Sequence, residues 1–207
     1  GYKRRFEIPP AHPNCRCRIS AQVVPVKSFQ GHRGRAGHVG GSLPRNAAAV
    51  SQAEQEIFGA SKENAVIIDA DGNVVLRKSG TKDRIAFTQD DAKAFSGNVF
   101  THNHPNPEGY SGCVSFSDLD VQMASTYKVR EMRAIGDKWA YSLQLSDDLE
   151  WKEINKAFQK ASKQVKAEWQ PLIVSKEMAV KDANANFHHE VWSKVGDAIG
   201  NDRFNYE

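Results

Sequence analysis

The sequence contains little that would direct the protein to a membrane, a disulfide framework or a nucleic acid. No stretch approaches the roughly 18 apolar residues that predict a transmembrane helix. Three cysteines in 207 residues are too few for a disulfide framework. The net charge of +3 is too small to argue for nucleic-acid binding. We therefore expect no membrane and no nucleic acid among its partners.

What the sequence does contain suits one folded domain with extensions. Hydrophobic residues make up 40% and charged residues 26% of the chain, which is ordinary for a soluble protein. The first residue is Gly rather than Met, so we expect a piece of a longer polypeptide. Residues 1–26 are Pro-rich and extended, and residues 27–45, rich in Gly and basic residues, predict a flexible linker. The domain itself is expected at 46–207, with 147–207 as a helical cap.

Hydrophobic periodicity and turn residues predict the elements of the domain up to residue 145. Helices are expected near 47–59 and 118–128, and strands near 64–69, 73–78, 84–88, 98–103, 130–135 and 138–145. The expected hairpin turns are Asp71-Gly72-Asn73 and Gly136-Asp137.

From Asp147 onward the pattern is helical and amphipathic. Trp169-Gln170-Pro171 is expected to interrupt it, with a second helix starting before Met178 and running to Ile199. That second helix carries His188 and His189, for which we expect a core or surface position rather than metal binding.

The most informative stretch begins with His102-Asn103-His104-Pro105 and continues to Phe116-Ser117-Asp118-Leu119-Asp120-Val121. Side chains alternate along a strand, so His102 and His104 would point to the same face. An Asp in the first turn of the following helix can complete the site. Two imidazoles, one carboxylate and an open fourth position describe a catalytic rather than a structural zinc site.

These residues resemble the motif of the JAMM (MPN+) zinc metalloproteases, in which a distant Glu is followed by His-x-His-Pro, a hydrophobic residue and Ser-x-x-Asp. The resemblance implies that His102, His104 and Asp120 hold Zn2+ and that Ser117 orients or stabilises the reacting oxygen. It also implies an α/β fold with a JAMM-type sheet flanked by helices, extended here by C-terminal helices. The loop after His104 is longer than is usual in that family.

The register of the Ser-x-x-Asp motif has two alternatives, because Ser115 and Asp118 have the same spacing. We prefer Ser117 and Asp120. Phe116 and Val121 then supply the hydrophobic flanks, and the same residues form a capping box with a hydrophobic staple.

Hydrolysis also needs a general base. Glu63 opens the apolar run 65–68, and its place at the start of a strand is similar to that of the catalytic Glu in bacterial JAMM proteins. Glu54 and Glu56 are rivals, but both lie in a helical pattern and are expected on its solvated face. We assign the base to Glu63.

The N-terminal His12-Pro13-Asn14-Cys15-Arg16-Cys17 resembles the C-terminal end of the head-morphogenesis domain of phage Mu F-type minor capsid proteins. The resemblance covers about 20 residues and indicates origin rather than activity. It implies a location in the bacterial host cytoplasm or in the phage virion. His12, Cys15 and Cys17 are expected to bind no metal within this chain, and Cys113 is expected to be an unliganded thiol.

The sequence thus predicts zinc-dependent hydrolysis of a peptide or isopeptide bond, with Glu63 moving the proton. The expected substrate is a polypeptide: a phage capsid protein or the chain's own linker, which carries Gly40-Gly41. The alternative is a structural or interaction module of the virion that keeps the JAMM fold and cleaves nothing. His102-Asn103-His104 is no evidence for an HNH nuclease, because the named residues of that family are dispersed over a whole ββα unit.

Overall fold

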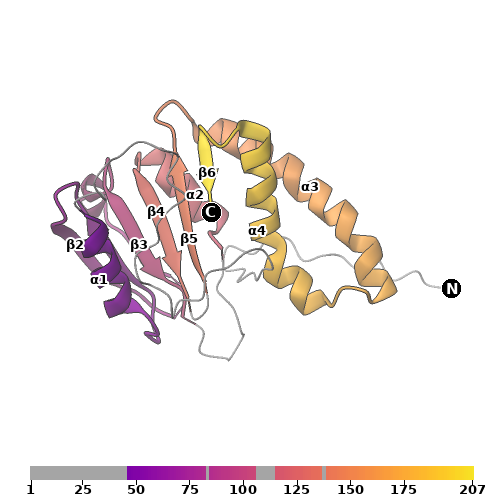
Figure 1. The fold of residues 1–207 in the computed structure, drawn as a ribbon, viewed down its shortest axis with the longest axis horizontal. Helices are drawn as coiled ribbons and strands as arrows, with labels where there is room; N and C mark the ends of the chain where they lie inside the picture. Colours follow the sequence, from indigo (N-terminus) through magenta and orange to yellow (C-terminus); the bar gives the residue numbers. More distant parts are fainter. Residues whose placement is uncertain (1–45, 83, 106–114, 137–138) are drawn as a thin grey trace.

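The computed structural model describes residues 46–207 except 83, 106–114 and 137–138. The described part is a mixed α/β structure whose six-stranded sheet has the order β2-β1-β3-β4-β5-β6 (Figure 1). The strands are β1 (Asn64–Ile68), β2 (Val74–Ser79), β3 (Val99–Asn103), β4 (Glu131–Ile135), β5 (Ala140–Leu145) and β6 (Phe204–Tyr206). The helices are α1 (Ala47–Ile57), the 3-10 helix η2 (Asp91–Ala94), α2 (Asp118–Thr126), α3 (Trp151–Ser175) and α4 (Val180–Ile199).

The connection from β3 to β4 determines where the site can form. These two strands are parallel, whereas β1 is antiparallel to both β2 and β3. Parallel neighbours need a crossover, and α2 lies in that crossover. The start of α2 is therefore brought back towards the end of the sheet at which β3 finishes.

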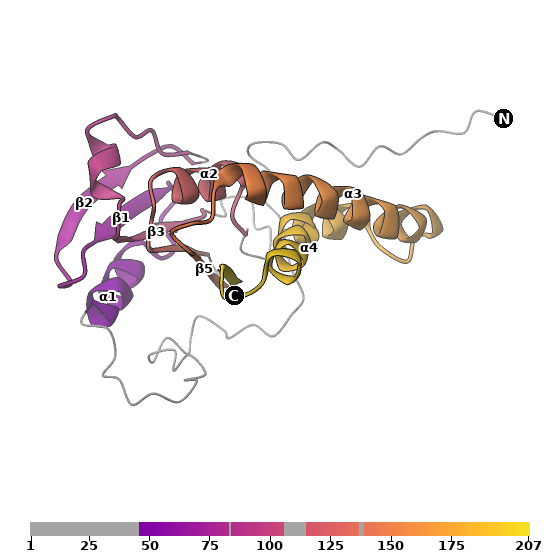
Figure 2. The same ribbon diagram turned by 90° about the horizontal axis from the view of Figure 1, so that it is seen from above.

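The two faces of the sheet have separate apolar cores, and α1 covers one of them (Figure 2). On that face, three residues of α1 pack against four residues of the sheet. The helix contributes Val50, Ala53 and Ile57, and the strands contribute Val66, Ile68, Val99 and Ile135. On the other face, Ala65, Ile67 and Phe100 belong to a larger core that also includes residues of α2, α3 and α4. The period-two alternation in β1 therefore assigns each of its side chains to one core.

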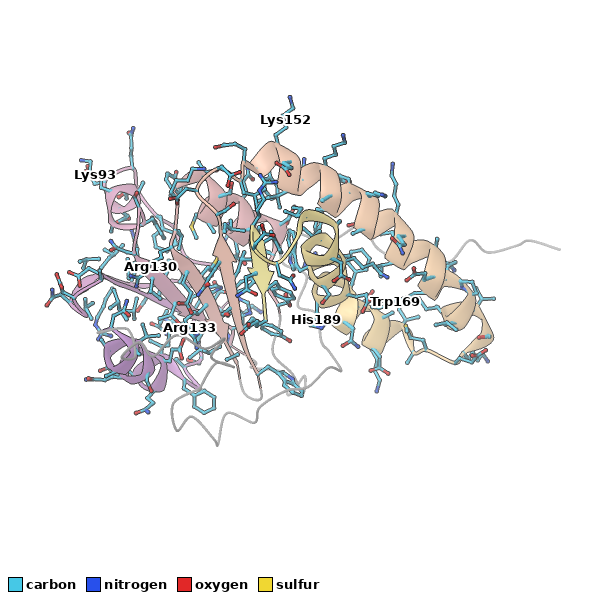
Figure 3. The ribbon with its side chains drawn as sticks, turned by 45° about the horizontal axis from the view of Figure 1, so that its top comes forward. Lys93, Arg130, Arg133, Lys152, Trp169 and His189 are labelled. Atoms are coloured by element: carbon cyan, nitrogen blue, oxygen red, sulfur yellow. The ribbon has the colours of Figure 1, made fainter. Side chains whose placement is uncertain are left out.

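Helices α3 and α4 pack against each other; α4 also packs against β6 at the edge of the sheet, and α3 against α2. Aromatic rings join α3, α4 and β6: the ring of Phe158 is tilted against that of Trp192 with centroids 4.6 Å apart, and Trp192 stacks on Phe204 at 5.9 Å. In Figure 3, Trp169 lies between the two helices and Lys152 points away from them. Within the described ranges, none of the helices combines the length and the apolar character needed to cross a membrane.

Three expectations about elements were wrong. Residues 84–88 form no strand; Phe87 instead packs edge-on against Phe95 and Phe100, so this apolar segment covers the larger core without pairing. Pro171 lies inside α3, and α4 begins at Val180, after Met178. Proline has no backbone N–H, so the Ala167 carbonyl, four residues earlier, lacks its usual helical donor. Both Pro171 and Ala167 are exposed. Water can satisfy that carbonyl, so the helix continues.

Strand β6 had no counterpart in the predicted elements. It pairs antiparallel with β5, joining Leu143 to Tyr206 and Leu145 to Phe204. The remaining predicted helices and strands are confirmed, with ends displaced by a few residues. The turn at Asp71-Gly72-Asn73 is also confirmed: the side chain of Asp69 accepts hydrogen bonds from Asp71 N and Asn73 N.

The buried acid Glu54 provides a stability prediction. It is 3% exposed on α1, accepts from Arg133 Nε at 2.6 Å and from Thr101 Oγ1 at 3.1 Å, and so lies on the α1 face of the sheet (Figure 3 labels Arg133). Glu54→Ala would leave the Arg133 guanidinium with Glu131 alone, and we expect unfolding in urea to show a loss of about 3 kcal/mol.

Glu56→Ala is the matched control on the same helix. Its partner Arg77 is half exposed and 2.7 Å away, so its removal should change the unfolding free energy by less than about 1 kcal/mol. Equal effects of the two substitutions would contradict a structural role for the Glu54–Arg133 pair.

Candidate metal centre

The C-terminal end of β3 carries His102 and His104. Their ring nitrogens Nε2 lie 2.9 Å apart and their ring centroids 4.7 Å apart. His104 N–H donates to the Ile135 carbonyl at 2.7 Å, which extends the β3–β4 pairing by one residue, and Pro105 follows. The predicted placement of both imidazoles on one face is confirmed, and His102 stacks on Phe100 on the side of the larger core.

The start of α2 holds Asp120 through a capping box. Ser117 is the N-cap: its Oγ accepts from Asp120 N at 3.2 Å, while Asp120 Oδ2 accepts from Ser117 N and Oγ, each at 2.8 Å. Phe116 and Val121, the expected staple, are both fully buried in the larger core. The predicted capping box is thus confirmed, and it fixes the carboxylate in the first turn, where the helix dipole favours a negative charge.

The strand and the helix together bring His102, His104 and Asp120 into one cluster. One potential ligand atom from each lies within 4.8 Å of the others, and in the described part of the chain no other group of three or more His, Cys, Asp or Glu side chains meets that condition. Asp118 is not a member. Two nitrogens bound tetrahedrally to zinc at 2.0–2.1 Å would lie about 3.3 Å apart, so the observed 2.9 Å needs only a small adjustment.

Burial favours the neutral form of the His102 imidazole. The residue is 3% exposed, and burial lowers the pKa of its imidazole, while the charge of Asp120 and the backbone of Arg133 act in the opposite direction. A neutral imidazole is the form that can bind a metal ion. The residues present therefore fit a zinc ion in donor type, spacing and charge.

Glu63 lies immediately before β1 and is half-buried. Its N–H donates to the Thr81 carbonyl at 2.7 Å and its carbonyl accepts from Gly80 N at 2.8 Å, which holds its backbone along the β2 side. Ala65 is paired with His102 across β1 and β3. Since side chains two residues apart share a face, we expect Glu63 on the face that carries His102 and His104.

The two rival acids lie elsewhere. Glu54 is buried against Arg133 and Thr101 on the opposite face of the sheet, so the expectation that it is solvated was wrong. Glu56 is paired with Arg77 at the surface.

Helix α4 places Trp192 and His188 near the start of α2, and the sequence did not predict these contacts. Trp192 Nε1 donates to the Phe116 carbonyl at 2.8 Å, which ties α4 to the residue before the N-cap of α2. His188 is fully buried, and within the described part of the chain neither of its ring nitrogens has a hydrogen-bond partner. Burial lowers the pKa of its imidazole, against the opposing effect of the charges of Asp118 and Asp120. His189 bonds Tyr206 Oη through Nδ1 and is labelled in Figure 3. The described cluster of His102, His104 and Asp120 includes neither of these histidines.

His12, Cys15, Cys17 and Cys113 lie outside the described residues, as does the linker at Gly40-Gly41. Comparison of the chain with protein-family models, with curated proteins and with solved structures found no match.

Proposed function

We propose that this chain is a zinc-dependent peptidase or isopeptidase of the JAMM type. The observation that carries the proposal is the cluster of His102, His104 and Asp120, whose ligand atoms lie within 4.8 Å of one another. The proposal is supported further by Ser117, whose hydroxyl is hydrogen-bonded to Asp120, and by Glu63, which immediately precedes β1, the strand next to β3.

Zinc in such a site lowers the pKa of water to about 7 and polarises a carbonyl group. The chain's own residues supply the rest of the chemistry. Glu63 accepts the proton of the attacking water at its carboxylate and returns it to the leaving amine. The Ser117 hydroxyl donates to the oxygen that gains negative charge. In the structure that hydroxyl donates to Asp120 Oδ2, so it must rotate to take this role.

The proposed substrate is a polypeptide, with the phage or prophage head as the setting. This part of the proposal rests on the N-terminal resemblance to head-morphogenesis proteins. The linker at Val39-Gly40-Gly41-Ser42 is a substrate candidate within the same chain, because tethering raises its effective concentration.

A non-catalytic module of the virion is the second candidate, and one observation favours it. The 2.9 Å separation of His102 Nε2 and His104 Nε2 also suits a direct hydrogen bond between two neutral imidazoles. In that case the cluster would be complete without a metal ion, and the protein would bind zinc weakly and cleave nothing.

Zinc analysis separates the two candidates. Protein purified without chelator is expected to contain about one zinc per chain, because the three donors and their spacing suit that ion. A His102→Ala/His104→Ala variant should lose the zinc, whereas His189→Ala on α4 should keep it. Hydrolysis is then measured on fluorescence-quenched peptides that carry the Val39–Ser42 sequence, in linear and lysine-linked form. Unchanged zinc content in the double variant would refute the proposed centre.

A further inference from the structure

Asn103, the residue between the two histidines, has a buried side chain that points away from them. It is 2% exposed. Its Oδ1 accepts from the backbone N–H of Asn64 at 2.6 Å, and its Nδ2 donates to the Lys62 carbonyl at 3.0 Å. Longer contacts join Nδ2 to the Ala60 carbonyl at 3.4 Å and Oδ1 to Asn64 Nδ2 at 3.5 Å. One carboxamide thus bonds the backbone on both sides of Glu63.

The backbone at Glu63 is also hydrogen-bonded on its opposite side, the side of β2. Glu63 N–H donates to Thr81 and the Glu63 carbonyl accepts from Gly80. The backbone around Glu63 is therefore bonded on the β2 side by the main chain and on the β3 side by the Asn103 side chain. The regular β1–β3 pairing ends at Ala65 and His102, so the carboxamide continues the contact between these strands past the last regular pair.

We propose that Asn103 is a positioning residue that holds Glu63 at a fixed distance from the metal ligands on β3. The inference rests on the function proposed above, in which Glu63 is the base. His102, Asn103 and His104 are consecutive, so any movement of the ligand strand is transmitted to Glu63 through two hydrogen bonds. A base held in this way keeps its orientation before substrate arrives.

Only a side chain with both a donor and an acceptor at this length can make the two bonds. Leucine has nearly the same size and makes neither, and serine is too short to reach Lys62 and Asn64 together. Asn46 offers a matched control. It is 4% exposed, and its Nδ2 donates to the Asp69 carbonyl at 3.2 Å, so it fastens the opposite end of β1.

The first measurement is hydrogen exchange of the Asn64 amide in the full chain, with and without zinc. Asn103→Leu removes the acceptor of that amide, and we expect its exchange to become at least about tenfold faster. Asn46→Leu should leave it unchanged although it also costs stability. Asn103→Ser serves the same purpose if the leucine variant does not fold. Unchanged exchange in a folded Asn103 variant would overturn the proposal.

The second measurement is a double-mutant cycle with Glu63→Gln, using the fluorescence-quenched peptides. Asn103→Leu is expected to lower kcat by about 10- to 100-fold with KM and zinc content retained. In the Glu63→Gln background it should cause no further loss, because Asn103 acts through Glu63. Equal losses in both backgrounds would overturn the positioning role while the peptidase function stands. If the unaltered chain cleaves none of the peptides, the proposed function fails, and the exchange experiment still decides whether Asn103 holds this segment.

Discussion

Glu63→Gln is expected to retain zinc and the fold and to lower kcat by about 10²- to 10⁴-fold, the usual contribution of a general acid–base group. The amide has the size of the carboxyl group but cannot take and return a proton. The backbone bonds of Glu63 to Thr81 and Gly80 do not involve the side chain, so they should survive the substitution. The measurements are zinc content, thermal unfolding and hydrolysis of the fluorescence-quenched peptides.

Glu56→Gln is the control for this prediction. Glu56 lies on α1 in a surface pair with Arg77, and its substitution should leave kcat unchanged. Full activity of Glu63→Gln would contradict the assignment of the base. Glu54 would not be a good replacement, because Arg133 and Thr101 bind its carboxylate on the opposite face of the sheet.

The parts of the fold that were predictable depend on patterns within a few residues. The apolar run of β1, the alternation that places His102 and His104 on one face and the Asp71-Gly72-Asn73 turn are local, and the structure contains all of them. The predictions at Phe87 and Pro171 were wrong because the backbone structure at these residues depends on contacts and solvent exposure that the local sequence does not give. Phe87 found two aromatic rings to pack on instead of a strand partner, and Pro171 lies where water can replace its missing hydrogen bond.

The same distinction applies to the site. The capping box of Ser117 and Asp120 spans three residues and was readable from the sequence. The bonds from Asn103 to Lys62, from Arg133 to Glu54 and from Trp192 to Phe116 join residues 41, 79 and 76 positions apart. No periodicity links such positions, so these supports become visible only when the strands and helices are placed together.

Asp120→Ala is expected to remove zinc binding, while Asp118→Ala leaves it nearly intact. Asp120 belongs to the cluster with His102 and His104, and Asp118 does not. Loss of one of three protein ligands should weaken zinc affinity by more than about 100-fold, beyond the loss typical of residues that only support a ligand. Competition with a chromophoric chelator measures the affinity of each variant.

A second effect of Asp120→Ala has to be separated from ligand loss, since Asp120 also completes the capping box. Ser117→Ala removes the cap at a cost of about 1 kcal/mol but leaves the Asp120 carboxylate in place. It should therefore bind zinc with nearly the affinity of the unaltered chain. If Ser117→Ala lost zinc as fully as Asp120→Ala, the order of the first turn of α2 would be the requirement rather than the carboxylate. If Asp118→Ala lost zinc and Asp120→Ala kept it, the site would belong to the register of Ser115 and Asp118. The three variants together thus test the identity of the third ligand independently of any substrate.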